Sequence, residues 1–301
     1  MKSTELKAFL EGLYVTYNRR ELVYPDPLVF LYDYDDPSDR EIAGLVSSCL
    51  AYGRVAQILK SVQKILSPMG SRPHRFLLRR ASDLRGLFGD FRHRFTTGEH
   101  MAALLERTSD VLRAHGTLEA FMGDCLQKGG NLMEGLNRFA RGLEPKHAKL
   151  PPTIQTQGDK AHSAPDAYPS DCQGKTGRMR PERLQFSLLS APENGSACKR
   201  LLLWLKWMVR HDDVDPGGWS ILLPRDLLMP TDTHIHNIAL RLGLTQRRQA
   251  DLKTVVEITR GFADLAPEDP TRYDFALSRF GIRTGLSVET LMELAGQRPD
   301  L

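Results

Sequence analysis

Apolar residues recur at helical spacing along most of this 301-residue chain, and that periodicity constrains the fold more than any other feature. The longest such segment runs from 39 to 66, and Pro68 and Gly70 follow it as terminators. Similar stripes predict helices over 99–114, 117–127, 132–142, 199–210, 233–242, 249–263 and 271–280. No alternation of polar and apolar residues is long enough to predict a strand. We therefore expect an all-α fold.

The composition, 41% apolar and 26% charged, is typical of a soluble protein with one large or two modest domains. Residues 144–182 are rich in Pro, Gly, Ser and charge and predict a flexible insertion. It separates an N-terminal helical region, 1–143, from a C-terminal one, 183–301. No apolar run approaches the roughly 18 to 20 residues that cross a bilayer, and the first 18 residues read as an amphipathic helix. We expect a cytoplasmic protein without membrane contact.

The spacing of cysteines and histidines argues against a metal or a cofactor. No C-x-x-C pair is present, so zinc and iron–sulfur clusters lack their ligands. The four cysteines are expected to be free thiols: Cys49, Cys125, Cys172 and Cys198. His234 and His236 are two apart on a predicted helix and point to different sides. The acidic stretch 212–218 resembles a calcium loop, but Pro224 stands where the bidentate Glu should be.

Basic side chains are spread unevenly along the chain, whose net charge is +4. Residues 71–95 carry seven arginines against two aspartates. That density suits contacts with nucleic-acid phosphates, and a solvated helix face is an equally good interpretation.

A Gly-containing turn precedes the strongly apolar helix predicted over 199–210. Backbone N–H groups at such a helix start lie at the positive end of the helix dipole, where a phosphate can bind. Gly195, Ser196 and Ala197 suit that role, and Arg200 would add a charge. The turn is therefore a candidate phosphate-binding site.

Two lysines follow the turn on nearly one helix face. Lys199 and Lys206 are seven residues apart, which is close to two helical turns. A partly desolvated Lys beside a second cation has a lowered pKa and a fraction of nucleophilic amine. The alternative is that both extend to solvent or bind phosphate.

Asp232 opens the helix predicted over 233–242, after Pro230 and Thr231. An Asp there caps a helix without any further role. If the two helix starts meet in a cleft, however, Asp232 becomes an acidic partner for a basic group of 199–210.

Both helix starts resemble motifs of the helix-hairpin-helix DNA glycosylases. GSACK at 195–199 resembles their G-x-G-x-K hairpin, whose Lys is the nucleophile of the bifunctional members. PTDTHIHNIALRLGL at 230–244 is similar to the segment that carries their catalytic Asp. RYDFALSRFGI at 272–282 resembles the later helix on which the archaeal 8-oxoguanine DNA glycosylases carry a base-recognising Asp. Those archaeal enzymes are the closest analogue.

The resemblance implies a role for each matching residue. Lys199 would be the nucleophile and Asp232 the catalytic carboxylate. Lys206 and Asp274 would contact the base. The competing interpretation of the last segment makes Asp269 a helix cap and Asp274 a surface acid.

Over a wider span the chain resembles a bacterial family of unknown function. Three motifs carry this likeness between Lys199 and Ile282: KRLxxxLxWMVRxDDVDxGxW, PxDTHxxxIxxxLGL and DPxxYDFALxxxGI.

The glycosylase resemblance implies a two-lobed helical fold. The first helix and the residues after about 230 would form one lobe, residues from about 25 to 229 the other, and the cleft would lie between them. The implied activity is excision of a damaged base from double-stranded DNA by a monomer, with abasic-site lyase activity through a Lys199 Schiff base.

The sequence also departs from that group. Ala197 replaces the second hairpin Gly, and Ser278 stands where the archaeal enzymes have a base-stacking Trp. Trp219 is a candidate for the missing stacking surface, or else a core residue. Two other classes stay open, a non-catalytic DNA-binding module and a helical interaction protein, and the identity of the base is open.

Overall fold

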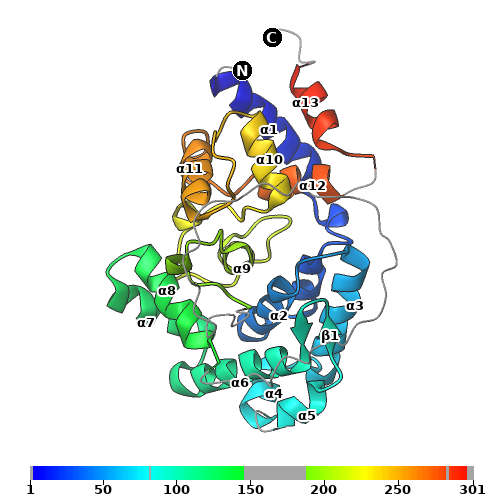
Figure 1. Cartoon of the computed structure of the whole chain (residues 1–301), viewed down its shortest axis with the longest axis vertical. Helices are drawn as coiled ribbons and strands as arrows, with labels where there is room; N and C mark the ends of the chain where they lie inside the picture. The colour runs from blue at the N-terminus through cyan, green and yellow to red at the C-terminus, as the bar shows by residue number, and fades with distance from the viewer. Residues whose placement is uncertain (1–2, 81–82, 146–187, 283–284, 297–301) are drawn as a thin grey trace, which may run out of the picture.

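The computed structural model describes residues 3–80, 83–145, 188–282 and 285–296, and this part of the chain is mostly helical, which confirms the all-α fold class (Figure 1). Its α-helices are α1 (Ser3–Tyr17), α2 (Pro37–Cys49), α3 (Val55–Leu66), α4 (Pro73–Arg80), α5 (Leu84–Phe88), α6 (Gly98–His115), α7 (Leu118–Gly129), α8 (Leu132–Leu143), α9 (Lys199–Val209), α10 (Thr233–Arg241), α11 (Leu252–Ala263), α12 (Asp274–Ile282) and α13 (Val288–Gly296). A short antiparallel hairpin joins β1 (Arg92–His93) to β2 (Thr96–Thr97), and a 3-10 helix, η2, spans Pro27–Asp33. From residue 146 onward the insertion predicted over 144–182, with Cys172, lies outside the described residues.

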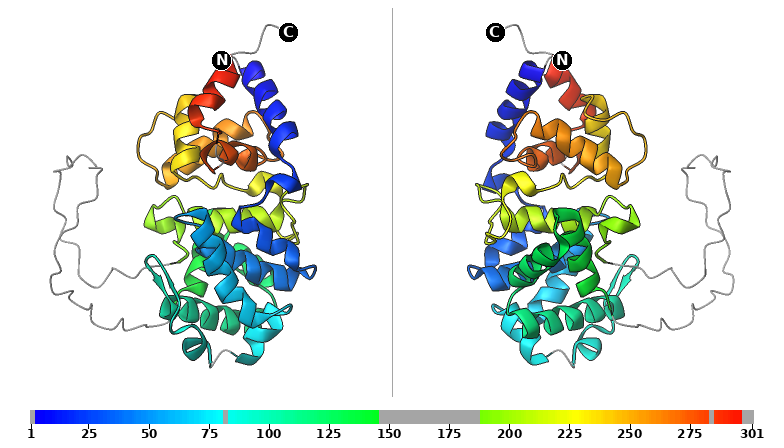
Figure 2. Two further views of the ribbon diagram at one scale, coloured as in Figure 1. Left: turned by 90° about the vertical axis from the view of Figure 1, so that its right-hand side faces the viewer. Right: turned by 90° about the vertical axis from the view of Figure 1, so that its left-hand side faces the viewer.

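Two apolar cores divide the described chain into two lobes (Figures 1 and 2). The upper lobe combines α1 with α10–α13, so both ends of the described chain belong to it. The lower lobe contains η2 and α2–α9. Each lobe therefore has a core of its own, and the chain crosses between them after α1 and again after α9.

Helix α1 belongs to the upper lobe because of one apolar stripe. Its buried residues, Leu6, Phe9, Leu10 and Leu13, follow the three- and four-residue spacing of a single helix face. That face packs on residues from Met229 to Leu291. Burial of each such side chain stabilises the fold by about 1.5–3 kcal/mol. These contacts hold α1 against residues that follow it by more than 200 positions in the sequence.

Helix α9 lies on the side of the lower lobe that faces the upper lobe, and it packs closely against α2. Trp204 donates an indole hydrogen bond to the carbonyl of Glu41 at 3.0 Å. A Cβ on Gly44 would lie 2.9 Å from the Trp204 ring, so the two helices approach this closely only with Gly at that position. Phe139 stacks on Trp204, and Trp219 meets it edge-on.

The Glu41 side chain joins three elements of the lower lobe. Its carboxylate accepts hydrogen bonds from the backbone N–H groups of Leu118 and Glu119, at the start of α7, and from the Trp219 indole. Burial raises the pKa of Glu41 to about 7. This buried acid therefore ties α2 to α7 and to the chain after α9.

The prediction of one helix over 39–66 was wrong. The structure ends α2 at Cys49 and begins α3 at Val55. Gly53, at φ +96°, adopts a conformation that breaks a helix and that side chains rarely allow. Helices α4, α5 and α13 and the β hairpin were not predicted, because their apolar patterns are short.

We predict that Glu41→Gln lowers the unfolding free energy by roughly 1–3 kcal/mol, because an amide NH₂ cannot accept the two N–H bonds that now end on one carboxyl oxygen, which accepts them whether the group is protonated or ionised. The raised pKa means that the contribution of Glu41 is complete below its ordinary pKa of 4.5 and is lost as the pH rises through about 7. The cost should therefore be larger at pH 5 than at pH 8. Urea denaturation at both pH values measures it, with exposed Glu293→Gln as control; an equal cost at both values would contradict the prediction.

Candidate active site

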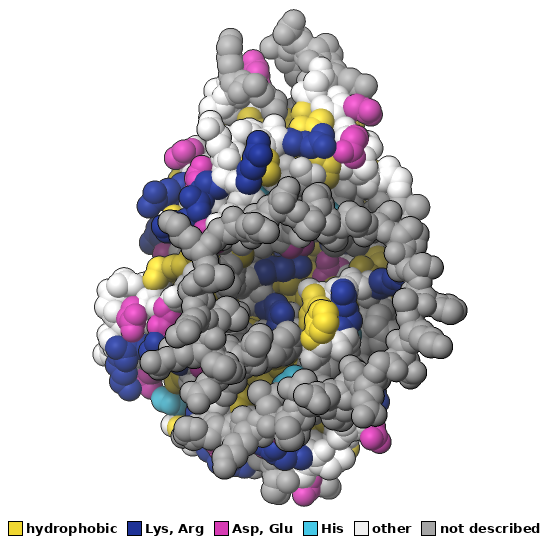
Figure 3. All heavy atoms as spheres, in the orientation of Figure 1, with side chains coloured by type: hydrophobic (Ala, Val, Ile, Leu, Met, Phe, Trp, Pro, Cys, Tyr) yellow, Lys and Arg dark blue, Asp and Glu magenta, His cyan; other side chains and the backbone are white. Residues whose placement is uncertain are grey.

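A cavity of about 780 Å³ lies between the two lobes. The lower lobe contributes the loop 50–54, the start of η2 and one face of α9, and the upper lobe contributes the starts of α10 and α12. Figure 3 shows charged and hydrophobic side chains together at the middle of this face, between the lobes. The volume falls within the roughly 300–1,000 Å³ of sites that bind small molecules.

Lys199 and Asp232 form an ion pair across this cavity, with Lys199 Nζ 3.1 Å from Asp232 Oδ2. The side chains are 32% and 27% exposed, so a molecule that enters the cavity can reach both. Lys199 belongs to the lower lobe and Asp232 to the upper. The structure thus brings together the two residues that the sequence analysis placed at separate helix starts.

Each partner is positioned by the first turn of a helix. Lys199 is the first residue of α9, and Cys198 before it has a left-handed backbone at φ +48°. Asp232 caps α10, where Oδ1 accepts hydrogen bonds from the N–H groups of His234 and Ile235, both at 2.9 Å. Capping therefore uses one oxygen of Asp232 and leaves the other for Lys199.

The pKa of Asp232 lies below its usual range. Burial would raise it, but the charge of Lys199 and the N–H bond from Ile235 together outweigh burial. Asp232 is consequently a carboxylate at neutral pH, and its negative charge faces the cavity.

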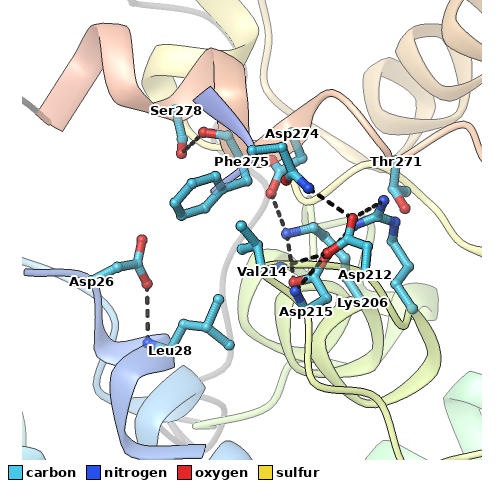
Figure 4. Close-up of polar contacts among 12 residues, drawn as sticks. Asp26, Leu28, Lys206, Asp212, Val214, Asp215, Thr271, Asp274, Phe275 and Ser278 are labelled. Atoms are coloured by element: carbon cyan, nitrogen blue, oxygen red, sulfur yellow. Dashed lines mark hydrogen bonds and ion pairs between the residues drawn. The ribbon is translucent and has the colours of Figure 1, made fainter. Parts of the chain in front are cut away.

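Lys206 forms a second, buried ion pair deeper in the cavity wall (Figure 4). Its ammonium lies 3.2 Å from Asp215 and 3.0 Å from Asp274, and its side chain is only 1% exposed. Burial alone would lower the pKa of Lys206, but the two carboxylates raise it. Lys206 is therefore a fixed cation and a poor nucleophile.

Asp274 is not the surface acid of the competing interpretation. It is buried at the first residue of α12 and faces the cavity beside Lys206. Asp269, the expected cap, lies five residues before that helix and pairs with Arg210 at 3.0 Å.

Arg210 extends the buried charges toward α1. Its guanidinium contacts Asp215, Asp269 and, at 2.7 Å, Asp212. Asp212 also accepts hydrogen bonds from Tyr14 and Asn18, both at 3.0 Å. The network from Lys206 to Tyr14 therefore joins α9 to two separate parts of the upper lobe.

Of the remaining predicted site residues, three line the cavity and two lie outside its lining. Ser196, Ala197 and Arg200 line the cavity, and Arg200 lies over the Tyr52 ring at 5.0 Å. Gly195 is outside the lining, with a left-handed backbone and a carbonyl that accepts the N–H of Leu252. Trp219 is also outside it, buried in the lower core, and this corrects its assignment as a stacking surface.

Sequence reasoning missed the aromatic part of the wall, which consists of Tyr52, Trp207 and Phe275. It also missed Asp26 at the cavity, whose carboxylate pairs with the buried Arg279 of α12 at 2.8 Å. Among the residues that sequence reasoning missed, only Arg210 could have been found from the sequence. It follows Lys206 by about one helical turn, which places it near the same helix face.

Two negative findings concern only residues 3–80, 83–145, 188–282 and 285–296. There, no group of three or more His, Cys, Asp or Glu side chains is arranged to hold a metal ion. No helix in those ranges has the length and apolarity needed to span a bilayer. Cys49, Cys125 and Cys198 are free and buried.

The site and fold define a two-lobed helical protein with a Lys–Asp pair at the inter-lobe cavity. The chain belongs to a family described as proteins of unknown function, DUF2400, which matches residues 26–283. Searches of curated proteins and of solved structures found no match. The match contains both cavity walls and omits α1 and α13. It confirms the resemblance to an uncharacterised family.

We predict that Lys206→Met lowers the unfolding free energy by about 3–5 kcal/mol, because it leaves Asp215 and Asp274 as buried carboxylates without this cation. Lys206→Met combined with Asp274→Asn should recover part of that loss. Urea denaturation measures both variants, and Lys128→Met, at an exposed position of α7, is the control. A loss below about 1 kcal/mol for Lys206→Met would show that the network is not structural.

Asp232→Asn, in contrast, should cost at most about 1 kcal/mol. The Asn oxygen keeps both capping bonds, and a partly exposed ion pair contributes little to stability. Asp232→Ala removes the cap and should cost more, up to about 2 kcal/mol. Thermal melts rank the two variants, and the capping assignment is wrong if Asn destabilises as much as Ala.

Proposed function

We propose that this protein excises a damaged base from double-stranded DNA. Lys199 is the nucleophile, and the Asp232 carboxylate stabilises the positive charge that develops on the sugar. The Lys199–Asp232 pair carries the proposal, because a reachable amine and an ionised carboxylate face one cavity from opposite lobes. The proposed fold class is that of the helix-hairpin-helix glycosylases, on the sequence resemblance of 195–199 and 230–244.

The cavity has the size and chemistry that an extruded base requires. A base inside a duplex is unreachable, so enzymes that act on it rotate it into a pocket of aromatic and polar groups. Here Tyr52, Trp207 and Phe275 supply aromatic surface, while Asp274 supplies a buried acceptor. A carboxylate favours a base edge with N–H donors, as an oxidised purine presents.

Positive charge in the cavity lining suits the DNA backbone. Arg54, Lys199 and Arg200 all belong to this lining. Phosphate contacts of this kind provide most of the affinity of DNA-binding proteins and make it salt-dependent. The proposed partner is therefore a duplex, bound with its damaged strand over the cavity.

The chemistry balances with groups already present. The bond between C1′ of the sugar and the base breaks, and the base leaves with the electron pair and a proton from the Lys199 ammonium. The freed amine then attacks C1′, one of its protons passes to the ring oxygen O4′ as the C1′–O4′ bond breaks, and a protonated imine between C1′ and Nζ results. Asp232, ionised and 3.1 Å from Nζ, stabilises the positive charge that develops on the sugar. In a subsequent β-elimination, water takes a proton from C2′, the C3′–O bond breaks, and the 3′ phosphate leaves with the electron pair.

Lys199→Gln should abolish borohydride trapping on duplex DNA that contains an abasic site, because no amine remains to form the imine. Asp232→Asn should slow base excision by on the order of 100-fold or more, with the fold intact. Lys128→Gln, at an exposed position of α7, is the matched control and should trap like the wild type. Undiminished trapping in Lys199→Gln would refute the nucleophile. Salt-sensitive DNA binding without trapping in the wild type would leave a non-catalytic DNA-binding protein.

A further inference from the structure

Phe95 is an aromatic side chain that the fold leaves in solvent. It is 66% exposed, and among the described residues only one other aromatic, Tyr24, belongs to the large hydrophobic side chains that are exposed. Single exposed apolar side chains are common on protein surfaces. Phe95 differs from the others in its place on a strained turn that is hydrogen-bonded to the cavity wall.

The hairpin presents Phe95 at its tip. Arg92 pairs with Thr97 and His93 with Thr96, so Arg94 and Phe95 form a two-residue turn. Arg94 has φ +50°, and turns of this kind favour Gly or Asn because other side chains are strained in the left-handed region. Among the described residues the only other non-Gly residue with positive φ is Cys198, which lines the cavity. Costly backbone of this kind gathers at functional sites.

The hairpin is fastened to the rim of the cavity. The Tyr52 hydroxyl donates to the carbonyl of His93 at 2.8 Å and lies 2.7 Å from the hydroxyl of Thr96. The His93 ring bonds in turn to the carbonyl of Tyr52 at 2.9 Å. Tyr52 is itself part of the cavity wall. The turn is consequently held in a fixed position relative to the cavity.

Arg94 strengthens that attachment and adds charge. Its side chain lies against Gly53, where a Cβ would be 2.9 Å from Arg94 Cδ, and Gly53 also lines the cavity. The Arg94 guanidinium lies 5.5 Å from the centre of the Phe95 ring, and exposed Arg92 precedes it in the hairpin. In a complex with DNA, such a ring can stack on bases, and the two arginines beside it can contact the phosphates on either side of those bases.

We infer that Phe95 inserts into the DNA duplex and occupies the space that the extruded base leaves. The inference rests on the proposed function, because it assigns the hairpin to the DNA from which the cavity receives its base. Apolar side chains that enter a base stack replace part of the lost stacking and hold the helix open. Arg92 and Arg94 bind the phosphates on either side, and the fastening to Tyr52 and Gly53 keeps the wedge and the cavity in register.

The test compares wild type with Phe95→Ala, Phe95→Leu and the control Ile221→Ala, an exposed apolar residue beside α7. Binding is measured to a duplex with a tetrahydrofuran abasic analogue and to the same duplex without it. Phe95→Ala should reduce the preference for the abasic duplex roughly 10-fold, since stacking on one base contributes about 1–3 kcal/mol. Phe95→Leu should retain most of the preference, and Ile221→Ala all of it.

Borohydride trapping on duplex and on single-stranded abasic DNA separates this inference from the proposed function. The ratio of duplex to single-strand trapping should fall in Phe95→Ala, because only a duplex needs a wedge. If Phe95→Ala keeps the wild-type binding preference and trapping ratio, the wedge is refuted while Lys199 trapping stands. If the wild type never traps but Phe95→Ala still loses the abasic preference, the reaction is refuted and the wedge stands. A wild type without any abasic preference overturns the wedge.

Discussion

Two lysines of α9 and Arg210, the residue that directly follows this helix, are each paired with an acid of the other lobe, and the relation between the lobes depends on these pairs. Lys199 meets Asp232, Lys206 meets Asp274, and Arg210 meets Asp269. The opposite face of α9 carries the apolar residues of the lower core, Trp204 among them. The apolar face of α9 therefore belongs to the core of the lower lobe, and its polar face forms the contact with the upper lobe.

Burial decides what each of these pairs can do. The two inner cations are surrounded by carboxylates and nearly inaccessible, so they fix geometry at a cost in desolvation that only good pairing offsets. The outer pair is reachable, and its acid is kept ionised by the amine and by the helix start that it caps. The proposed reactive amine is thus the member of the row with the least burial, held in place by neighbours that do not react.

The periodicity of the sequence was sufficient for the class of the fold and for most of the long helices. Lys199 and Asp232 could be singled out because each stands at a helix start with a recognisable local pattern. The aromatic wall could not, because Tyr52 follows an unforeseen helix break and its place depends on contacts with a distant hairpin. Trp219 misled for a related reason, since only the packed core shows that its indole is used by Glu41.

The upper core needs both ends of the described chain, and this has a consequence for the order of synthesis. A ribosome makes α1 more than 200 residues before it makes the residues that cover the apolar stripe of α1, Met229 to Leu291. The lower lobe, whose own core depends on few residues beyond 227, can form while α1 still has no partner. Until those residues are made, the stripe has no partner that covers it, and the cavity acquires its second wall only when residues 230–281 have been synthesised.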